Sequence, residues 1–183
     1  MEHSRIPILP LDDPQALLGA FKTHLPVYSL RAAAGKFGNG EAVEPEGWVE
    51  VPDRKLDSGM FVARVEGHSM EPRIPDGSLG VFRANPQGTR QGKTVLAQWR
   101  GPADPETGGS FAVKVYESQK AYGPDGHWTH EAVRLKPVNP EFPPLDFTLE
   151  DGEFLKVLAE YVGIVEPVKV PPASIEGDRR HSP

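Results

Sequence analysis

Turn signals divide this chain into many short apolar stretches, and their spacing restricts the fold more than any other sequence feature. Three of them are PDG at 75–77, GPADPETGG at 101–109 and GPDG at 123–126. With 19 glycines and 20 prolines in 183 residues, the chain favours short strands over long helices. The pattern predicts a mostly β chain with a compact, barrel-like fold. The segment that begins at Pro26 starts like a strand, and we expect further strands at 48–51, 60–66, 79–82, 94–100, 111–117, 131–136, 147–149 and 154–165.

The two ends of the chain differ from this central region. The segment 12–25 predicts a short helix, because Asp13 suits an N-cap and Pro14 the first helical position. The C-terminal segment is polar and rich in proline, which is typical of disorder. We therefore expect an N-terminal arm over 1–34 that carries the helix, one compact domain over 35–166, and a disordered tail over 167–183.

Composition disfavours several classes of function. The net charge of -6 at pH 7 is a poor platform for DNA, because DNA binding depends on lysine and arginine side chains that neutralise phosphates. The sequence has no apolar run long enough for a membrane span and no secretory signal pattern, so we expect a cytoplasmic protein without membrane contact. The absence of cysteine excludes disulfides and cysteine-ligated zinc, and we expect neither a metal nor another cofactor.

The segment VARVEGHSMEPRIPDGSLGVF, residues 62–82, interrupts two apolar stretches with a serine at position 69. A serine hydroxyl is a weak nucleophile unless a base lies beside it. The neighbouring His68 is poorly placed for that role, because adjacent side chains of an extended chain point apart. The remaining histidines fall in termini or in a loop, so a serine–histidine–aspartate triad has no support. Without a base, Ser69 would be an ordinary turn residue.

A lysine is the alternative base, and serine–lysine pairs are an established variant of the triad. A free lysine has a pKa of about 10.4, so the base must lie in apolar surroundings that lower its pKa by roughly 3–5 units. Two lysines lie within apolar strands: Lys114 in SFAVKVYE and Lys156 in EFLKVLAEYV. Either side chain would be exposed in the more common case, with its stem on the surface. The residues alone do not choose between them.

The segment 62–82 resembles the Gly-x-Ser-Met region of LexA-type serine peptidases, the family of LexA repressors, phage repressors and the UmuD polymerase accessory subunit. Three later segments resemble the same family in the same order: VLAQWRG…SFAVKVYE, VRLKPVNPEFPPLDF and LKVLAEYVGIV. The likeness covers roughly residues 27–166 and implies the LexA-type peptidase fold. It also selects Lys114 over Lys156 as the base.

The resemblance implies a role for each residue near the serine. Ser69 would be the nucleophile, and neutral Lys114 would take its proton. The oxyanion would be held by backbone N–H groups at His68 and Ser69, with Gly67 and Met70 in support.

The resemblance further implies a scissile bond inside the chain itself, at Ala34–Gly35 in LRAAAGKFGNG. The alternative is that this segment is only a flexible linker. For self-cleavage, residues 30–40 would have to swing into the active site, so a cleavable and a non-cleavable conformer would coexist. In the family, a RecA–DNA filament favours the cleavable conformer, and the peptidase domain forms a homodimer.

The sequence departs from the LexA repressors because residues 1–34 are too short for an N-terminal DNA-binding domain, which makes the chain closer to UmuD. The GPADPETGG segment is also longer than the corresponding turn of the family, and we expect it to contact a partner. We expect a self-cleaving regulatory switch in an SOS-like DNA-damage response or in a mobile-element or defence response. The alternatives are a non-cleaving dimerisation and binding module and a peptidase that acts in trans.

Overall fold

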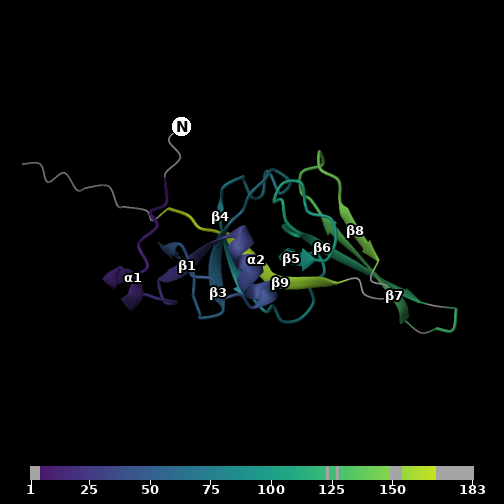
Figure 1. Cartoon of the computed structure of the whole chain (residues 1–183), viewed down its shortest axis with the longest axis horizontal. Coiled ribbons are helices and arrows are strands. Elements are labelled where there is room, and N and C mark those ends of the chain that lie inside the picture. The colour runs from purple at the N-terminus through teal and green to yellow at the C-terminus, as the bar shows by residue number, and fades with distance from the viewer. Residues whose placement is uncertain (1–4, 123, 127, 149–153, 168–183) are drawn as a thin grey trace, which may run out of the picture.

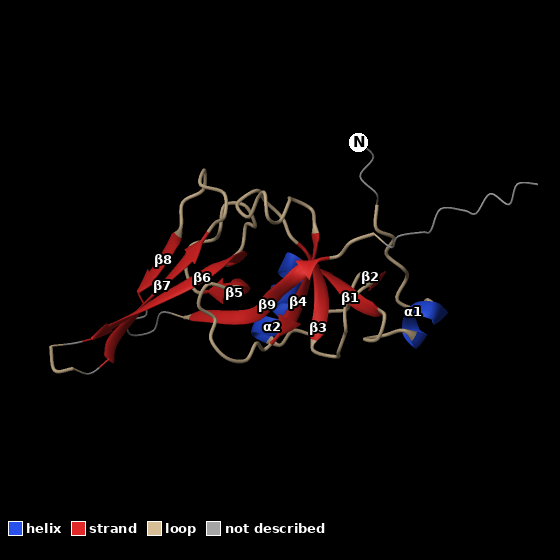
Figure 2. Cartoon of the chain, turned by 180° about the vertical axis from the view of Figure 1, so that it is seen from behind, coloured by secondary structure: helices blue, strands red, loops and turns tan. Residues whose placement is uncertain are grey.

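A single open sheet dominates the computed structural model of the chain (Figures 1 and 2). The structure describes residues 5–122, 124–126, 128–148 and 154–167. Within these residues, nine strands follow the order β2-β1-β3-β4-β9-β5-β6-β7-β8. The elements are α1 (Pro14–Leu18), β1 (His24–Ser29), α2 (Leu30–Asn39), β2 (Gly47–Glu50), β3 (Met60–Arg64), β4 (Leu79–Ala84), β5 (Thr94–Trp99), β6 (Phe111–Tyr122), β7 (Trp128–Lys136), β8 (Leu145–Thr148) and β9 (Leu155–Ile164).

The mostly β character is confirmed, but the sheet is not a closed barrel. Closure requires the first and last strands of the order to pair, and here β2 and β8 end the described sheet at opposite sides. The long β6–β7 hairpin extends away from the remaining strands and carries β8 with it, as Figure 1 shows. The sheet therefore spreads outward on this side instead of curling back towards β2.

The predicted helix over 12–25 is much shorter in the structure. Its start is as expected, because the Asp13 side chain accepts a hydrogen bond from the Ala16 N–H at 2.9 Å and Pro14 opens the helix. The helix ends at Leu18, and the chain enters β1 at His24. The prediction for residues 19–25 was wrong because Gly19 caps the helix, residues 21–23 form a turn, and His24 and Leu25 already pair with β2.

Residues 30–39 form α2, where the sequence predicted a helix-free segment. The Ser29 hydroxyl caps the N-terminus by accepting a hydrogen bond from the Ala32 N–H at 3.1 Å, and Gly40 ends the helix in a left-handed conformation with φ of 66°. Leu30, Ala33 and Ala34 are buried against one face of the sheet. The run of three alanines has the high helix propensity that this packing uses.

Strand β1 places part of the predicted arm inside the sheet. It pairs antiparallel with β2 on one side and parallel with β3 on the other, with Leu25 opposite Val49 and Val27 opposite Val62. The expected boundary between an arm and a domain, at 34/35, falls within α2. The described part of the arm is therefore continuous with the folded unit. The expected disordered tail lies outside the described residues apart from Pro167.

Leu25→Ala should show that β1 belongs to the folded core. The Leu25 side chain is 0% exposed, so its truncation should lower the free energy of unfolding by about 2–5 kcal/mol. The control is Leu18→Ala in α1, whose side chain is 82% exposed and whose loss should change stability by no more than about 0.5 kcal/mol. Urea unfolding followed by tryptophan fluorescence measures both. Equal effects of the two substitutions would contradict an integral β1.

Two apolar layers flank the sheet and fix the position of its loops. The layer beneath α2 contains a row of aromatic rings, in which Phe61 stacks on Phe37 with ring centroids 4.3 Å apart and on Phe82 with centroids 5.6 Å apart. Leu25 and Val27 belong to the layer on the other face. No helix among the described residues has the length and apolar character needed to cross a membrane. The packed sheet holds the β3–β4 and β5–β6 connections, which meet at the site described next.

Candidate active site

The serine predicted as nucleophile lies in the connection between β3 and β4. Gly67 adopts a left-handed conformation with φ of 96°, and its N–H donates to the Asp76 carboxylate at 2.7 Å. This turn directs Ser69 inward, so that it is only 4% exposed, and Met70 packs below it in the core. The Ser69 carbonyl accepts hydrogen bonds from the N–H groups of Val138 and Asn139 at 3.0 and 2.9 Å. The backbone of the serine is therefore fixed on both sides.

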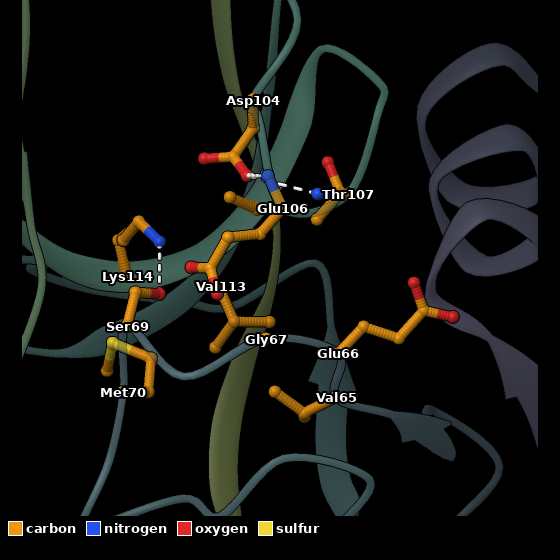
Figure 3. A pocket seen from close by; sticks show the side chains of 11 residues that line it. Val65, Glu66, Gly67, Ser69, Met70, Asp104, Glu106, Thr107, Val113 and Lys114 are labelled. Carbon is orange, nitrogen blue, oxygen red and sulfur yellow. Dashed lines mark hydrogen bonds between the residues drawn. The ribbon is translucent and has the colours of Figure 1, made fainter. Parts of the chain in front are cut away.

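Lys114 of β6 reaches the serine from the neighbouring part of the sheet. Its Nζ lies 2.5 Å from the Ser69 Oγ, as Figure 3 shows, and the side chain is 4% exposed. Lys114 is opposite Val95 in the β5–β6 pair, and its neighbours Phe111 and Val113 lie in the layer beneath α2. The structure thus brings the two predicted catalytic residues into contact across 45 positions of sequence. Lys156, the other candidate base, is exposed on β9.

Burial lowers the pKa of Lys114, because a charged ammonium loses its hydration in this pocket. The nearby carboxylates of Asp104 and Glu106 act in the opposite sense, since a negative charge stabilises the protonated amine. The desolvation effect is the larger of the two. A buried amine with a lowered pKa is the form of lysine that can accept a proton from a serine hydroxyl.

The His68 side chain points away from this pair, as the sequence predicted. Its Nδ1 lies 3.0 Å from a Glu71 carboxylate oxygen, and the side chain is 60% exposed. The hydrogen bond with Glu71 raises the pKa of His68, and the charges of Glu71, Asp76 and Glu106 add to that effect. The imidazole therefore interacts with exposed carboxylates and not with the serine hydroxyl.

The β5–β6 loop contributes residues that sequence reasoning did not assign to the site. Asp104 is 5% exposed, and its carboxylate accepts hydrogen bonds from the N–H groups of Glu106 and Thr107 at 2.9 and 3.1 Å. Together with the serine and lysine, this loop lines a small pocket formed by Val65, Glu66, Gly67, Ser69, Met70, Asp104, Glu106, Thr107, Ala112, Val113 and Lys114. The acidic residues in ADPET (103–107) were the one sequence feature that could have indicated this contribution, but the segment was predicted only as a turn.

Of the predicted oxyanion donors, the His68 N–H already has a hydrogen-bond acceptor, and the predicted scissile bond lies in a helix outside the serine pocket. The His68 N–H points to the Glu106 carboxylate at 2.6 Å, and the Asn139 side-chain amide donates to the His68 carbonyl at 3.1 Å. Ala34 and Gly35 lie within α2, where Ala34 is buried and the Gly35 carbonyl accepts hydrogen bonds from the cap. They are not among the residues that line the serine pocket. The scissile bond stays a prediction.

Nothing in the described parts of the chain resembles a metal centre, since no three histidine or acidic side chains gather in a suitable group. The chemistry that this arrangement supports is a serine nucleophile activated by a buried amine.

Comparison with known families gives a match over most of the chain. The model of the Peptidase S24-like family matches residues 26–162, which include Ser69 and Lys114. A search of curated proteins finds no significant match.

Proposed function

Because the chain belongs to the Peptidase S24-like family, the group of LexA- and UmuD-like peptidases, we propose that it hydrolyses peptide bonds with Ser69 as nucleophile and Lys114 as general base. The observation that carries this proposal is the 2.5 Å contact between Nζ and Oγ in a buried pocket. The distance is within reach of direct proton transfer. Burial lowers the pKa of the amine and so favours its neutral, proton-accepting form.

The proposed reaction follows from these positions. Neutral Lys114 takes the Ser69 proton while Oγ bonds to the carbonyl carbon of the substrate, and the carbonyl oxygen becomes an oxyanion held by backbone N–H groups. The C–N bond then breaks, and the protonated lysine gives its proton to the leaving amine. Water attacks the resulting acyl ester, with Lys114 again as the base, and restores the free serine.

Self-cleavage at Ala34–Gly35 is part of the proposal, and it requires a change in α2. A peptidase cleft binds its substrate in an extended conformation, whereas this peptide bond is helical and packed against the sheet. Unwinding α2 removes the buried contacts of Leu30, Ala33 and Ala34, so the cleavable conformer is a minor state of the resting protein. Cleavage should therefore be slow without a trigger. A RecA-like filament that stabilises the unwound conformer would be one such trigger.

Incubation of the purified protein at alkaline pH should yield fragments 1–34 and 35–183, because alkaline pH neutralises Lys114. Intact mass spectrometry detects the fragments, and Ser69→Ala is the control that should remain whole. Because β1 is paired on both sides, the fragments should co-elute under native conditions and separate only in denaturant. An unchanged intact mass over days, with and without an activated RecA filament, would contradict self-cleavage.

The helical state of the Ala34–Gly35 bond also favours a second substrate, an extended peptide supplied in trans. A quenched-fluorescent peptide with the sequence of residues 27–40 separates the two cases, because it needs no unwinding of α2. Cleavage of this peptide by a chain that leaves its own bond intact would assign the activity to trans substrates. Failure to cleave both the peptide and the chain would leave the dyad without proteolytic function.

A further inference from the structure

The Glu106 carboxylate occupies a backbone donor that the proposed reaction needs. The His68 N–H donates to the Glu106 Oε2 at 2.6 Å, a short distance typical of a charge-assisted hydrogen bond. His68 and Ser69 are the residues whose N–H groups would hold the oxyanion of the tetrahedral intermediate. A negatively charged oxygen therefore already lies at one of these donors before any substrate arrives.

The Glu106 carboxylate can occupy this position only because residue 67 is a glycine. A Cβ on Gly67 would lie 2.3 Å from the Glu106 Oε2 and 2.6 Å from its carboxyl carbon, distances that real side chains do not tolerate. The conformation of Gly67, with φ of 96°, also disfavours any other residue. Figure 3 shows the Glu106 side chain extending from the loop towards Gly67, between the Ser69–Lys114 pair and Glu66. The space around Gly67 is thus filled by Glu106.

The loop that carries Glu106 is held in place by partly buried hydrogen bonds. The Asp104 carboxylate accepts from the N–H groups of Glu106 and Thr107, and the Thr107 hydroxyl donates to the Phe111 carbonyl at 2.9 Å. Asp104 itself is buried, and the Gly108 N–H donates to its carbonyl at 2.8 Å. The position of the carboxylate is consequently set by the fold of the β5–β6 loop and not by an unrestrained surface side chain.

From this geometry we infer that Glu106 is an inhibitory plug, which fills the oxyanion site of the free enzyme and must leave before a substrate carbonyl can enter. The inference rests on the proposed peptidase function. Two negative oxygens cannot share one N–H donor because they repel each other at that distance, so the plugged state is inactive. The open state is a minor conformer, and its population limits the rate of acylation.

Labelling by a fluorophosphonate tests the plug, because the reaction needs the serine and the oxyanion site but no particular peptide. The Ser69 Oγ forms a bond to phosphorus, fluoride leaves, and Lys114 takes the proton. Glu106→Ala should raise the second-order labelling rate by about tenfold or more, since an open state populated at about 10% or less limits the wild type. Glu106→Gln keeps the shape but loses the charge, and it should give an intermediate rate.

Glu50→Gln is the control for the loss of one negative charge. Glu50 is exposed at the end of β2 and is not among the residues that line the serine pocket. Its replacement should leave the labelling rate within about twofold of the wild type.

The pH profile separates a plug from a purely electrostatic effect on the base. The charged groups around the Glu106 side chain are Lys114 of β6, the neighbouring His68, Asp104 of its own loop and Glu66, and Arg31 of α2 reaches the same loop at the Thr107 carbonyl. Loss of Glu106 also removes a charge that favours protonated Lys114. That effect disappears at alkaline pH, where Lys114 is neutral in both proteins. If Glu106 acts as a plug, Glu106→Ala should still be labelled faster than the wild type at alkaline pH.

The outcomes distinguish the plug from the peptidase function. Labelling of wild-type Ser69 with an equal or lower rate in Glu106→Ala would overturn the plug and leave the nucleophile in place. A rate advantage that vanishes at alkaline pH would also overturn it. Absence of a Ser69 adduct in every variant would overturn the proposed function. Independently of activity, the amide proton of His68 should move upfield in the NMR spectrum of Glu106→Ala, and an unmoved resonance would contradict the contact.

Discussion

Lys114→Met should abolish hydrolysis at every pH and make the folded chain more stable near neutrality. Methionine keeps most of the length and apolar character of the lysine stem but accepts no proton, so Ser69 loses its base. We expect a loss of about 10³-fold or more in the cleavage rate of the peptide that carries residues 27–40. At the same time, the substitution removes an amine that is buried without a salt bridge among the described residues.

The gain in stability has a defined dependence on pH. The folded state lowers the pKa of Lys114 below the ordinary value of 10.5, so the unfolded chain binds more protons between the two values. Wild-type stability should therefore rise with pH through this window, and the advantage of Lys114→Met should shrink towards pH 10.5. Near pH 7 the variant should be more stable by about 1 kcal/mol or more, which corresponds to a rise of about 2–4 °C in Tm.

Lys156→Met is the matched control, because Lys156 also lies in an apolar strand sequence but is exposed. It should leave both the cleavage rate and the pH dependence of Tm close to those of the wild type. Calorimetry between pH 6 and pH 10 and the peptide assay measure the two properties. A Lys114→Met protein that cleaves the peptide, or one that is less stable at every pH, would contradict a buried neutral base.

Ser69→Ala should lower peptide cleavage by about 10³-fold or more without unfolding the protein. The alanine removes one oxygen and leaves the core contact of Met70 and the backbone bonds to Val138 and Asn139 in place. Ser78→Ala, in the same β3–β4 connection, is the control, since its hydroxyl bonds only to the Pro75 carbonyl in the described structure. Residual cleavage by Ser69→Ala at the wild-type rate would assign the activity to another group or to a contaminant.

The strands around the site were predictable because their signals are local. The expected segments 60–66, 79–82, 94–100 and 111–117 match β3, β4, β5 and the first half of β6 to within a few residues. Each segment combines an apolar stretch with a turn signal nearby. Both of these features can be read from neighbouring residues without knowledge of distant contacts. The overall closure of the sheet was not predictable in this way, because it depends on which strands lie at the two ends of the order.

β1 was predicted only as a strand-like start at Pro26, with its first two residues assigned to the helix, and α2 was missed, because tertiary contacts decide both elements. β1 carries Pro26, which resembles a helix stop, and its partners lie at Gly47–Glu50 and Met60–Arg64. In α2, glycines at 35 and 38 obscured the helix propensity of the alanines, and the side chains that stabilise the helix belong to distant strands. Local preference therefore favoured a flexible segment where packing forms a helix.

The serine–lysine pair was predictable because the chemistry of the serine determines what kind of base it needs. A serine without a histidine requires a desolvated amine, which reduced the lysines to two, and the family resemblance then selected Lys114. The contribution of Glu106 had no such signal. Its contact with the His68 N–H joins two loops that are 38 positions apart, and only the folded structure determines which loop faces which.

Mapping of the fluorophosphonate adduct between pH 6 and pH 10 tests the serine–lysine dyad most directly, by intact mass and by peptide sequencing of the wild type and Lys114→Met. We predict a single adduct on Ser69 whose rate of formation rises with pH as Lys114 becomes neutral, and almost no labelling of Lys114→Met. An adduct at another residue, or a Lys114→Met protein that labels at Ser69 with the wild-type rate and pH profile, would contradict the dyad.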